Sequence, residues 1–121
     1  MDTFDLNWGI IKSFPIIYLD GYITQGAKQL LEETYNEIIG RVKTKMLIFD
    51  FSKIDYINSS GISFFLNILS ISNKTGIEII FAGLSDQIKK VIDIVELTDY
   101  VKVFDTIDTA IKYCNNELGE D

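Results

Sequence analysis

Histidine is absent from this chain of 121 residues, and cysteine and proline occur once each, as Cys114 and Pro15. Without histidine the chain cannot form a serine–histidine or cysteine–histidine catalytic pair, and most zinc sites are excluded. A single cysteine cannot form an internal disulfide bond. These absences disfavour an enzyme, and we expect no metal ion and no other cofactor.

Long apolar runs and an excess of basic residues are also missing. No stretch approaches the ~20 apolar residues needed to span a bilayer. The start, MDTFDLNWGI, lacks the basic and apolar regions of a signal peptide. We therefore expect a cytoplasmic protein without a membrane span. The net charge of -7, from 18 acidic and 11 basic residues, disfavours nucleic acid as a direct partner.

Hydrophobic residues make up 47% of the chain, which together with its length predicts one compact domain over residues 1–121. Apolar spacing and turn residues predict the element order β-β-α-β-α-β-α-β-α. The predicted strands are TFDLNW, FPIIYL, KMLIFDF, GIEIIFAG and VKVF, with a turn over Gly9 to Ser13 between the first two. The predicted helices cover 24–39 with Gly40 as stop signal, 59–73, a segment after Ser85 and a segment after Thr106. Cys114 falls on the apolar face of the last helix, which predicts a buried thiol. Such alternation is typical of an α/β fold with a mixed sheet of about five strands and about four helices.

The stretch DFSKIDYINSSGISFFL, residues 50–66, places Asn58, Ser59, Ser60 and Gly61 between a predicted strand and a predicted helix. Asn58 or Ser59 could cap that helix, because either side chain can accept a hydrogen bond from a free backbone N–H. The same helix end, with its partial positive charge, also tolerates a phosphate on a hydroxyl. A phosphate would add about two negative charges and repel a partner while the fold stays intact. The stretch therefore predicts either a plain helix cap or a phosphorylation switch.

The predicted helix after Gly61 carries apolar residues on two faces. At 100° per residue, one face holds Ile62, Phe65, Leu66 and Leu69, and the opposite face holds Phe64, Ile68 and Ile71. A helix on a sheet usually needs a single apolar stripe. The second stripe, which begins at Phe64, therefore covers either a neighbouring helix or a partner, and a weak homodimer is one form of partner.

The dodecamer DFSKIDYINSSG resembles the signature of STAS domains of the anti-sigma factor antagonist type. That signature is Asp-x-Ser, a short loop with an apolar residue, and then Asp-Ser-Ser-Gly or a close variant. The residues that match are Asp50, Ser52, Ile54, Ile57, Ser59, Ser60 and Gly61. GIEIIFAGLSDQIKKVIDIVEL and VKVFDTIDTAI look like the second half of the family, so the resemblance extends over nearly the whole chain. It implies a small sheet with the helices mainly on one side.

The resemblance also implies a regulatory, non-enzymatic function. In the family, a serine kinase of the GHKL type that is also an anti-sigma factor phosphorylates the position of Ser59. The unphosphorylated form binds this kinase and frees a sigma factor, and a serine phosphatase restores it. We expect Ser59 to be the phosphoacceptor. The phosphosite loop and partner surface are expected to include Asn58, Ser60, Gly61, Asp50, Ser52, Thr24 and Phe64.

Three of these residues have further expected roles. Asp50 should accept N–H bonds from the loop over residues 51–56, and Gly61 should let the backbone of a partner approach the first helical turn. Thr24, in GYIT, stands where the family often has the aspartate of Gly-x-Leu-Asp.

Asn58 likewise replaces the usual aspartate before the acceptor, and it can cap a helix about as well. Some family members are not phosphorylated and act as accessory subunits of transporters or stress-signalling complexes. That role is the alternative function.

Two other classes fit the sequence poorly. A receiver domain would use an aspartate at a strand end, such as Asp50, but it also needs an acidic pair after an early strand to hold Mg²⁺. Only Asp20 is available there. An enzyme built on a serine nucleophile would require a Gly-x-Ser-x-Gly elbow, and a nucleotide-binding enzyme a P-loop, and the chain contains neither.

Overall fold

The structure, a computed structural model, describes residues 3–117. The strands are β1 (Phe4–Ile11), β2 (Phe14–Ile23), β3 (Met46–Ile57), β4 (Glu78–Ala82) and β5 (Lys102–Phe104). The helices are α1 (Gln25–Arg41), α2 (Ser59–Thr75), α3 (Asp86–Ile94) and α4 (Ile107–Glu117), with the short 3₁₀ helix η1 (Leu97–Asp99) after α3. The predicted fold class and element order are confirmed.

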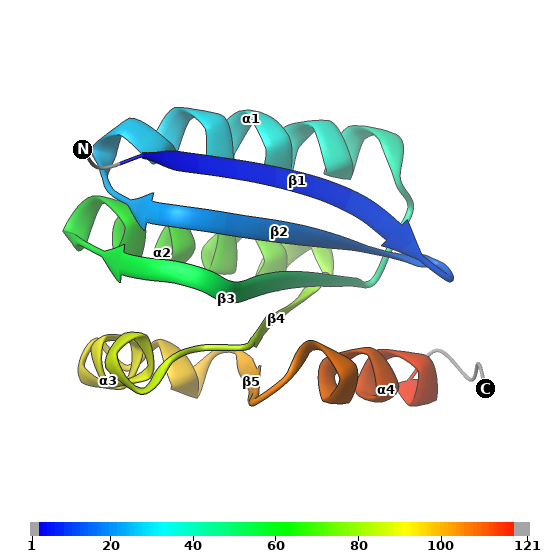
Figure 1. Cartoon of the computed structure of the whole chain (residues 1–121). Coiled ribbons are helices and arrows are strands. Elements are labelled where there is room, and N and C mark those ends of the chain that lie inside the picture. The colour runs from blue at the N-terminus through cyan, green and yellow to red at the C-terminus, as the bar shows by residue number, and fades with distance from the viewer. Residues whose placement is uncertain (1–2, 118–121) are drawn as a thin grey trace.

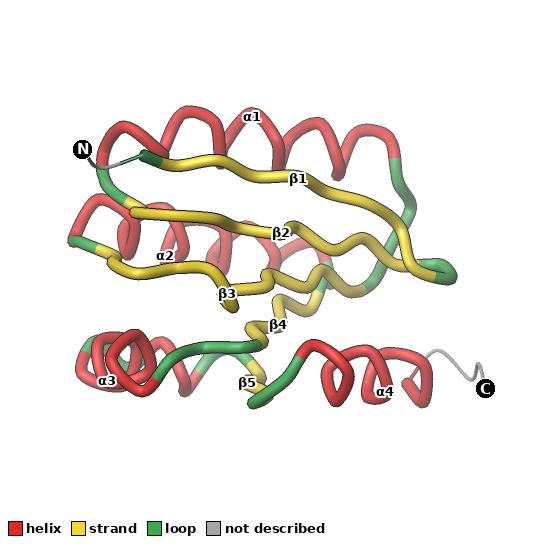
Figure 2. The backbone as a smooth tube through the Cα atoms, in the orientation of Figure 1, coloured by secondary structure: helices red, strands yellow, loops and turns green. Residues whose placement is uncertain are grey.

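The five strands form one mixed sheet in the order β1-β2-β3-β4-β5 (Figure 2). β1 and β2 are an antiparallel hairpin, and every later pair is parallel. Because parallel neighbours require crossover connections, each of α1, α2 and the α3–η1 segment carries the chain back to the start of the next strand. The amino-terminal ends of α1 and α2 therefore lie at the same end of the sheet, as Figure 1 shows at its left.

Helices cover both faces of the sheet unequally. The larger apolar core joins the sheet to α1, α2 and α3, and five phenylalanines lie at its centre with ring centroids 4.8 to 6.4 Å apart. These rings belong to Phe49, Phe51, Phe64, Phe65 and Phe81. The smaller core lies on the opposite face under α4. The helices thus lie mainly on one side of the sheet, as expected, and α4 is the exception.

Cys114 lies in the smaller core and is fully buried, as its place on the apolar face of the last helix predicts. Burial, followed by the nearby charges of Glu78 and Glu117, raises the pKa of its thiol to about 12. A thiol with so high a pKa stays protonated and unreactive near neutral pH. Cys114 is therefore a packing residue.

Three element boundaries differ from the prediction. The turn between the first two strands is Lys12 and Ser13 alone, so Gly9 lies within β1, paired with Ile16. β2 continues through DGY to Ile23 because it pairs with neighbours on both sides. α1 passes through Gly40 and ends at Arg41. Glycine at a helix end is a weak stop signal where tertiary packing continues the helix.

The predicted loop over residues 51–56 is wrong, because β3 runs without a break to Ile57. Within this part of β3 the buried residues recur every third position, at Phe51, Ile54 and Ile57, where a regular strand would bury every second. The pairing with β2 shifts at two places, between Tyr18 and Asp20 and between Gly21 and Tyr22. Each shift adds a residue to β3, as a β-bulge does, and so explains the unusual period.

Candidate functional site

The first turn of α2 is capped by Asn58. Its Oδ1 accepts hydrogen bonds from the backbone N–H groups of Ser60, at 3.0 Å, and Gly61, at 3.3 Å. The backbone of Asn58 is extended, as a helix cap requires. Of the two residues that could have capped the helix, the structure selects Asn58.

Ser59 is consequently the first residue of α2 and does not cap the helix. Its side chain is exposed, and its hydroxyl has no hydrogen-bond partner among residues 3–117. Ser60 is half-buried beside it. Exposed position, free hydroxyl and helix amino terminus coincide at Ser59, which is the arrangement that accepts a phosphate without unfolding the helix.

Gly61 serves packing, and its expected role as a point of approach for a partner is wrong. The residue is buried. A Cβ at this position would lie 2.6 Å from Cγ2 of Ile23, 2.8 Å from Cγ1 of Ile57 and 2.9 Å from the carbonyl oxygen of Ile23. The first turn of α2 thus sits directly on the ends of β2 and β3, where only glycine fits.

Thr24 lies next to this site, as the resemblance implied. It is the residue before α1, and its neighbour Ile23 accepts a hydrogen bond from the backbone N–H of Asn58 at 3.1 Å. The beginnings of α1 and α2 are therefore tied together through the ends of β2 and β3 (Figure 1). The Thr24 side chain makes no capping hydrogen bond to α1.

Asp50 and Ser52 lie away from the serine site. Asp50 stands seven residues before the end of β3, which corresponds to roughly 20 Å along a strand. Its Oδ1 accepts hydrogen bonds from the backbone N–H of Ser52, at 3.0 Å, and from the Ser52 hydroxyl, at 2.5 Å. The predicted N–H bond to Asp50 is confirmed, but it stabilises the first bulge of β3 and not a loop.

Gly83, just after β4, completes this second group. It has a φ of +74°, and a Cβ there would collide with the Ser52 hydroxyl and lie 3.1 Å from Oδ1 of Asp50. The Asp-x-Ser part of the motif thus packs closely against the chain that leaves β4.

Phe64 is fully buried among the phenylalanines of the larger core, so its assignment to the partner surface is wrong. The buried stripe of α2 runs between the two predicted faces, through Gly61, Phe64, Phe65, Ile68 and Ser72. Two apolar side chains at the edges of this stripe remain exposed, Leu66 at 48% and Ile71 at 42%. The apolar period of the sequence did not predict which side chains of α2 are buried, because the helix packs on both the sheet and α1.

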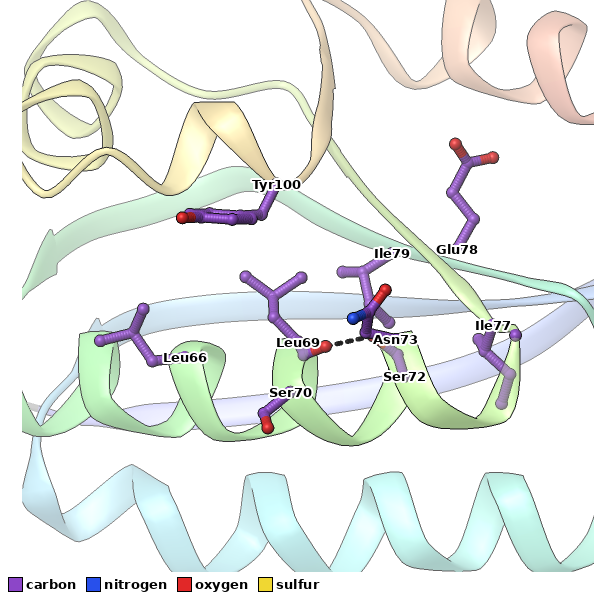
Figure 3. A pocket seen from close by; sticks show the side chains of 10 residues that line it. Leu66, Leu69, Ser70, Ser72, Asn73, Ile77, Glu78, Ile79 and Tyr100 are labelled. Atoms are coloured by element: carbon purple, nitrogen blue, oxygen red, sulfur yellow. Dashed lines mark hydrogen bonds between the residues drawn. The ribbon is translucent and has the colours of Figure 1, made fainter.

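A groove beside the second half of α2 was not predicted. Its volume is about 750 Å³, and it is formed by α2, the start of β4 and the chain after η1 (Figure 3). Leu66, Leu69 and Ile79 line it, and Tyr100 faces Leu66 and Leu69 from the other side. Tyr100 is 73% exposed. An aromatic residue after a 3₁₀ turn carries no sequence signal of exposure, so only the structure shows this feature.

Residues 3–117 contain neither a metal site nor a membrane-spanning helix. No group of three or more cysteine, aspartate or glutamate side chains is arranged to hold a metal ion. None of the helices in this part of the chain combines the length and the apolar character that a bilayer crossing requires.

The chain is similar to a known domain family and to several solved structures. The profile of the STAS domain matches residues 7–110. An anti-sigma factor antagonist from Mycobacterium paratuberculosis is similar in structure with a TM-score of 0.79 and 15% sequence identity, over 94% of this chain and 96% of that one. A sulfate transporter family protein from Wolinella succinogenes has a TM-score of 0.81 and 18% identity, over 92% of each chain.

The anti-sigma factor antagonist SpoIIAA is similar in two forms. Its unphosphorylated form has a TM-score of 0.77 and 18% identity, over 98% of this chain and 99% of that one. The phosphorylated form, from Bacillus, has a TM-score of 0.69 and 19% identity, over 92% and 98%. At these identities the solved structures establish a shared fold.

Proposed function

The chain belongs to the STAS domain family, and on that basis we propose that it is an anti-sigma factor antagonist whose contact with its partner is switched by phosphorylation of Ser59. It acts as a single, non-enzymatic binding domain in the cytoplasm. The main support for the proposal is the structure at the start of α2. Asn58 caps the helix, and Ser59 stays exposed with a hydroxyl that makes no hydrogen bond within residues 3–117.

Electrostatics supports a switch at this position. A phosphate on Ser59 would stand at the amino terminus of a 17-residue helix, where the partial positive charge and free N–H groups favour an anion. The fold would therefore tolerate the modification. A partner that covers the start of α2 would instead meet about two new negative charges, which a desolvated contact does not accommodate.

The comparisons support the same function. Two of the similar proteins are anti-sigma factor antagonists, and one of them, SpoIIAA, is known in an unphosphorylated and a phosphorylated form. The partner we propose is an anti-sigma factor that is also a serine kinase of the GHKL type, with a serine phosphatase as the enzyme that reverses the modification.

The test is phosphorylation of the purified chain by GHKL-type serine kinases encoded near it, followed by peptide mass spectrometry. We expect one phosphate on Ser59 and none on Ser60, because Ser60 is half-buried and its neighbour is exposed. Phosphate confined to Ser60, or a chain that binds the kinase without being modified, would contradict the proposal. Ser59→Ala is the matched control and should bind the kinase without accepting phosphate.

The second candidate is a constitutive accessory subunit of a transporter or a stress-signalling complex. The similarity to the Wolinella sulfate transporter family protein favours it, as does the loss of a carboxylate at both Asn58 and Thr24. An accessory subunit should bind its partner equally well with Ser59 unmodified or phosphorylated. Calorimetric titration of both forms separates the two functions.

A further inference from the structure

We infer that the groove beside the second half of α2 is a second docking point for the protein partner, and that it accepts an apolar side chain from a basic segment. The inference rests on the proposed function only in taking the partner to be a protein that contacts α2. It concerns a region distant from Ser59 in the helix, and the groove does not depend on phosphorylation.

The groove has the shape and chemistry of an anchor pocket. Its volume of about 750 Å³ exceeds what one side chain fills, and its walls are mainly apolar. Leu66 and Tyr100, which face each other across it, are 48% and 73% exposed. Large apolar and aromatic side chains exposed around a concavity are the usual centre of a protein contact.

The outward face of α2 connects this groove to the start of the helix. Ser59, Ser63, Leu66, Ser70 and Asn73 are all exposed and recur at helical spacing on one side. At about 1.5 Å per residue, the distance along the helix from Ser59 to Asn73 is ~21 Å. A partner helix of about 14 residues could therefore reach both the phosphoacceptor and the groove.

Charge identifies the kind of partner. The segment that leads to Tyr100 carries three exposed acidic side chains, Asp93, Glu96 and Asp99, and no basic one. None of the three forms an ion pair within residues 3–117. A basic segment would complement the acidic stretch that ends at Tyr100. A second copy of the chain would bring another net charge of -7 to this surface, which opposes self-association.

The inference can be tested with a defined probe. We would titrate the chain with an amphipathic helical peptide of leucine and lysine and with the same peptide carrying glutamate in place of lysine. Calorimetry gives the affinity, and amide chemical shifts give the location. We expect the lysine peptide to bind, with the shifts concentrated at Leu66–Ile79 and Tyr100, and the glutamate peptide not to bind.

Three variants make the test specific. Leu66→Asn and Tyr100→Ala should each weaken binding of the lysine peptide at least fivefold. Tyr18→Ala is the matched control, because Tyr18 is also partly exposed but lies in β2 on the sheet face opposite α2, and it should leave the affinity unchanged. Unchanged affinity in both groove variants, or shifts located elsewhere, would overturn the inference.

The remaining outcomes are equally informative. A concentration-dependent dimer that Leu66→Asn and Tyr100→Ala both abolish would place a second copy in the groove and overturn the choice of partner. The peptide assay contains neither kinase nor ATP. A chain that is never phosphorylated therefore refutes the proposed function alone, and failure of the peptide to find the groove refutes this inference alone.

Discussion

The two ends of α2 differ in how they are packed. At the amino-terminal end the features are polar and tightly packed, with Asn58 capping the helix and Gly61 pressed onto the ends of β2 and β3. At the carboxyl-terminal half the features are apolar and open, with Leu66 and Tyr100 facing each other across a groove. The contact that we propose at the amino-terminal end would therefore depend on charge, and the contact that we propose at the groove would depend on shape.

The tight packing at the amino-terminal end leads to the largest expected effect. Gly61→Ala should lower the free energy of unfolding by about 3 kcal/mol, because its Cβ would collide with Ile23 and Ile57. Gly40→Ala is the matched control. It is also a glycine within a helix, but no atom lies within 4 Å of its added Cβ, and the exchange should stabilise by about 0.5–1 kcal/mol. Urea denaturation of both variants measures the difference, and equal stability of the two would contradict the packing role.

A negative charge at the amino-terminal end of α2 should change partner affinity and fold stability in opposite directions. Ser59→Asp should weaken binding to the kinase-like partner about tenfold, or ~1.4 kcal/mol, because the carboxylate must be desolvated in the contact. The same carboxylate should raise the free energy of unfolding by about 0.3–1 kcal/mol through the helix dipole. Calorimetry and thermal melting report the two quantities. A variant that melts earlier, or that binds as the wild type does, would show that this end of α2 is not a charge-sensitive contact.

Because Asn58 is the cap, substitutions at Asn58 and at Ser59 should differ in their effect on stability, by less than the effects above. Asn58→Ala should lower the free energy of unfolding by about 1 kcal/mol, because two backbone N–H groups lose their acceptor. Ser59→Ala should change it by less than about 0.5 kcal/mol. Chemical denaturation of the pair checks this. If Ser59→Ala cost more than Asn58→Ala, Ser59 would be the cap and its hydroxyl would not be free.

The open end of α2 should show almost no effect on stability. Tyr100→Ala should change the free energy of unfolding by less than about 0.5 kcal/mol, because the side chain is 73% exposed. Leu97→Ala, three residues earlier and fully buried, should cost about 2–5 kcal/mol. Melting curves distinguish the variants, and a Tyr100→Ala protein as unstable as Leu97→Ala would make Tyr100 a core residue.

Local sequence patterns predicted the alternation of strands and helices correctly, because apolar spacing and capping residues act over short distances. They also predicted the position of the serine pair at the start of a helix, since Asn58, Ser59 and Gly61 follow a buried strand directly. Buried Cys114 followed from its place in the helical period. In each case the residues that carry the signal lie within a few turns of one another.

Which of these residues are exposed to a partner depends on how the elements pack together. The bulges of β3, which turn residues 51–56 from a predicted loop into strand, arise from the pairing with β2. Gly61 and Phe64 are buried by Ile23, Ile57 and the phenylalanines of the sheet, whose approach no local pattern encodes. The groove at Tyr100 exists because α2, β4 and the chain after η1 come together from separate parts of the sequence. Exposure depends on what packs nearby in space, and that is set by the assembled fold.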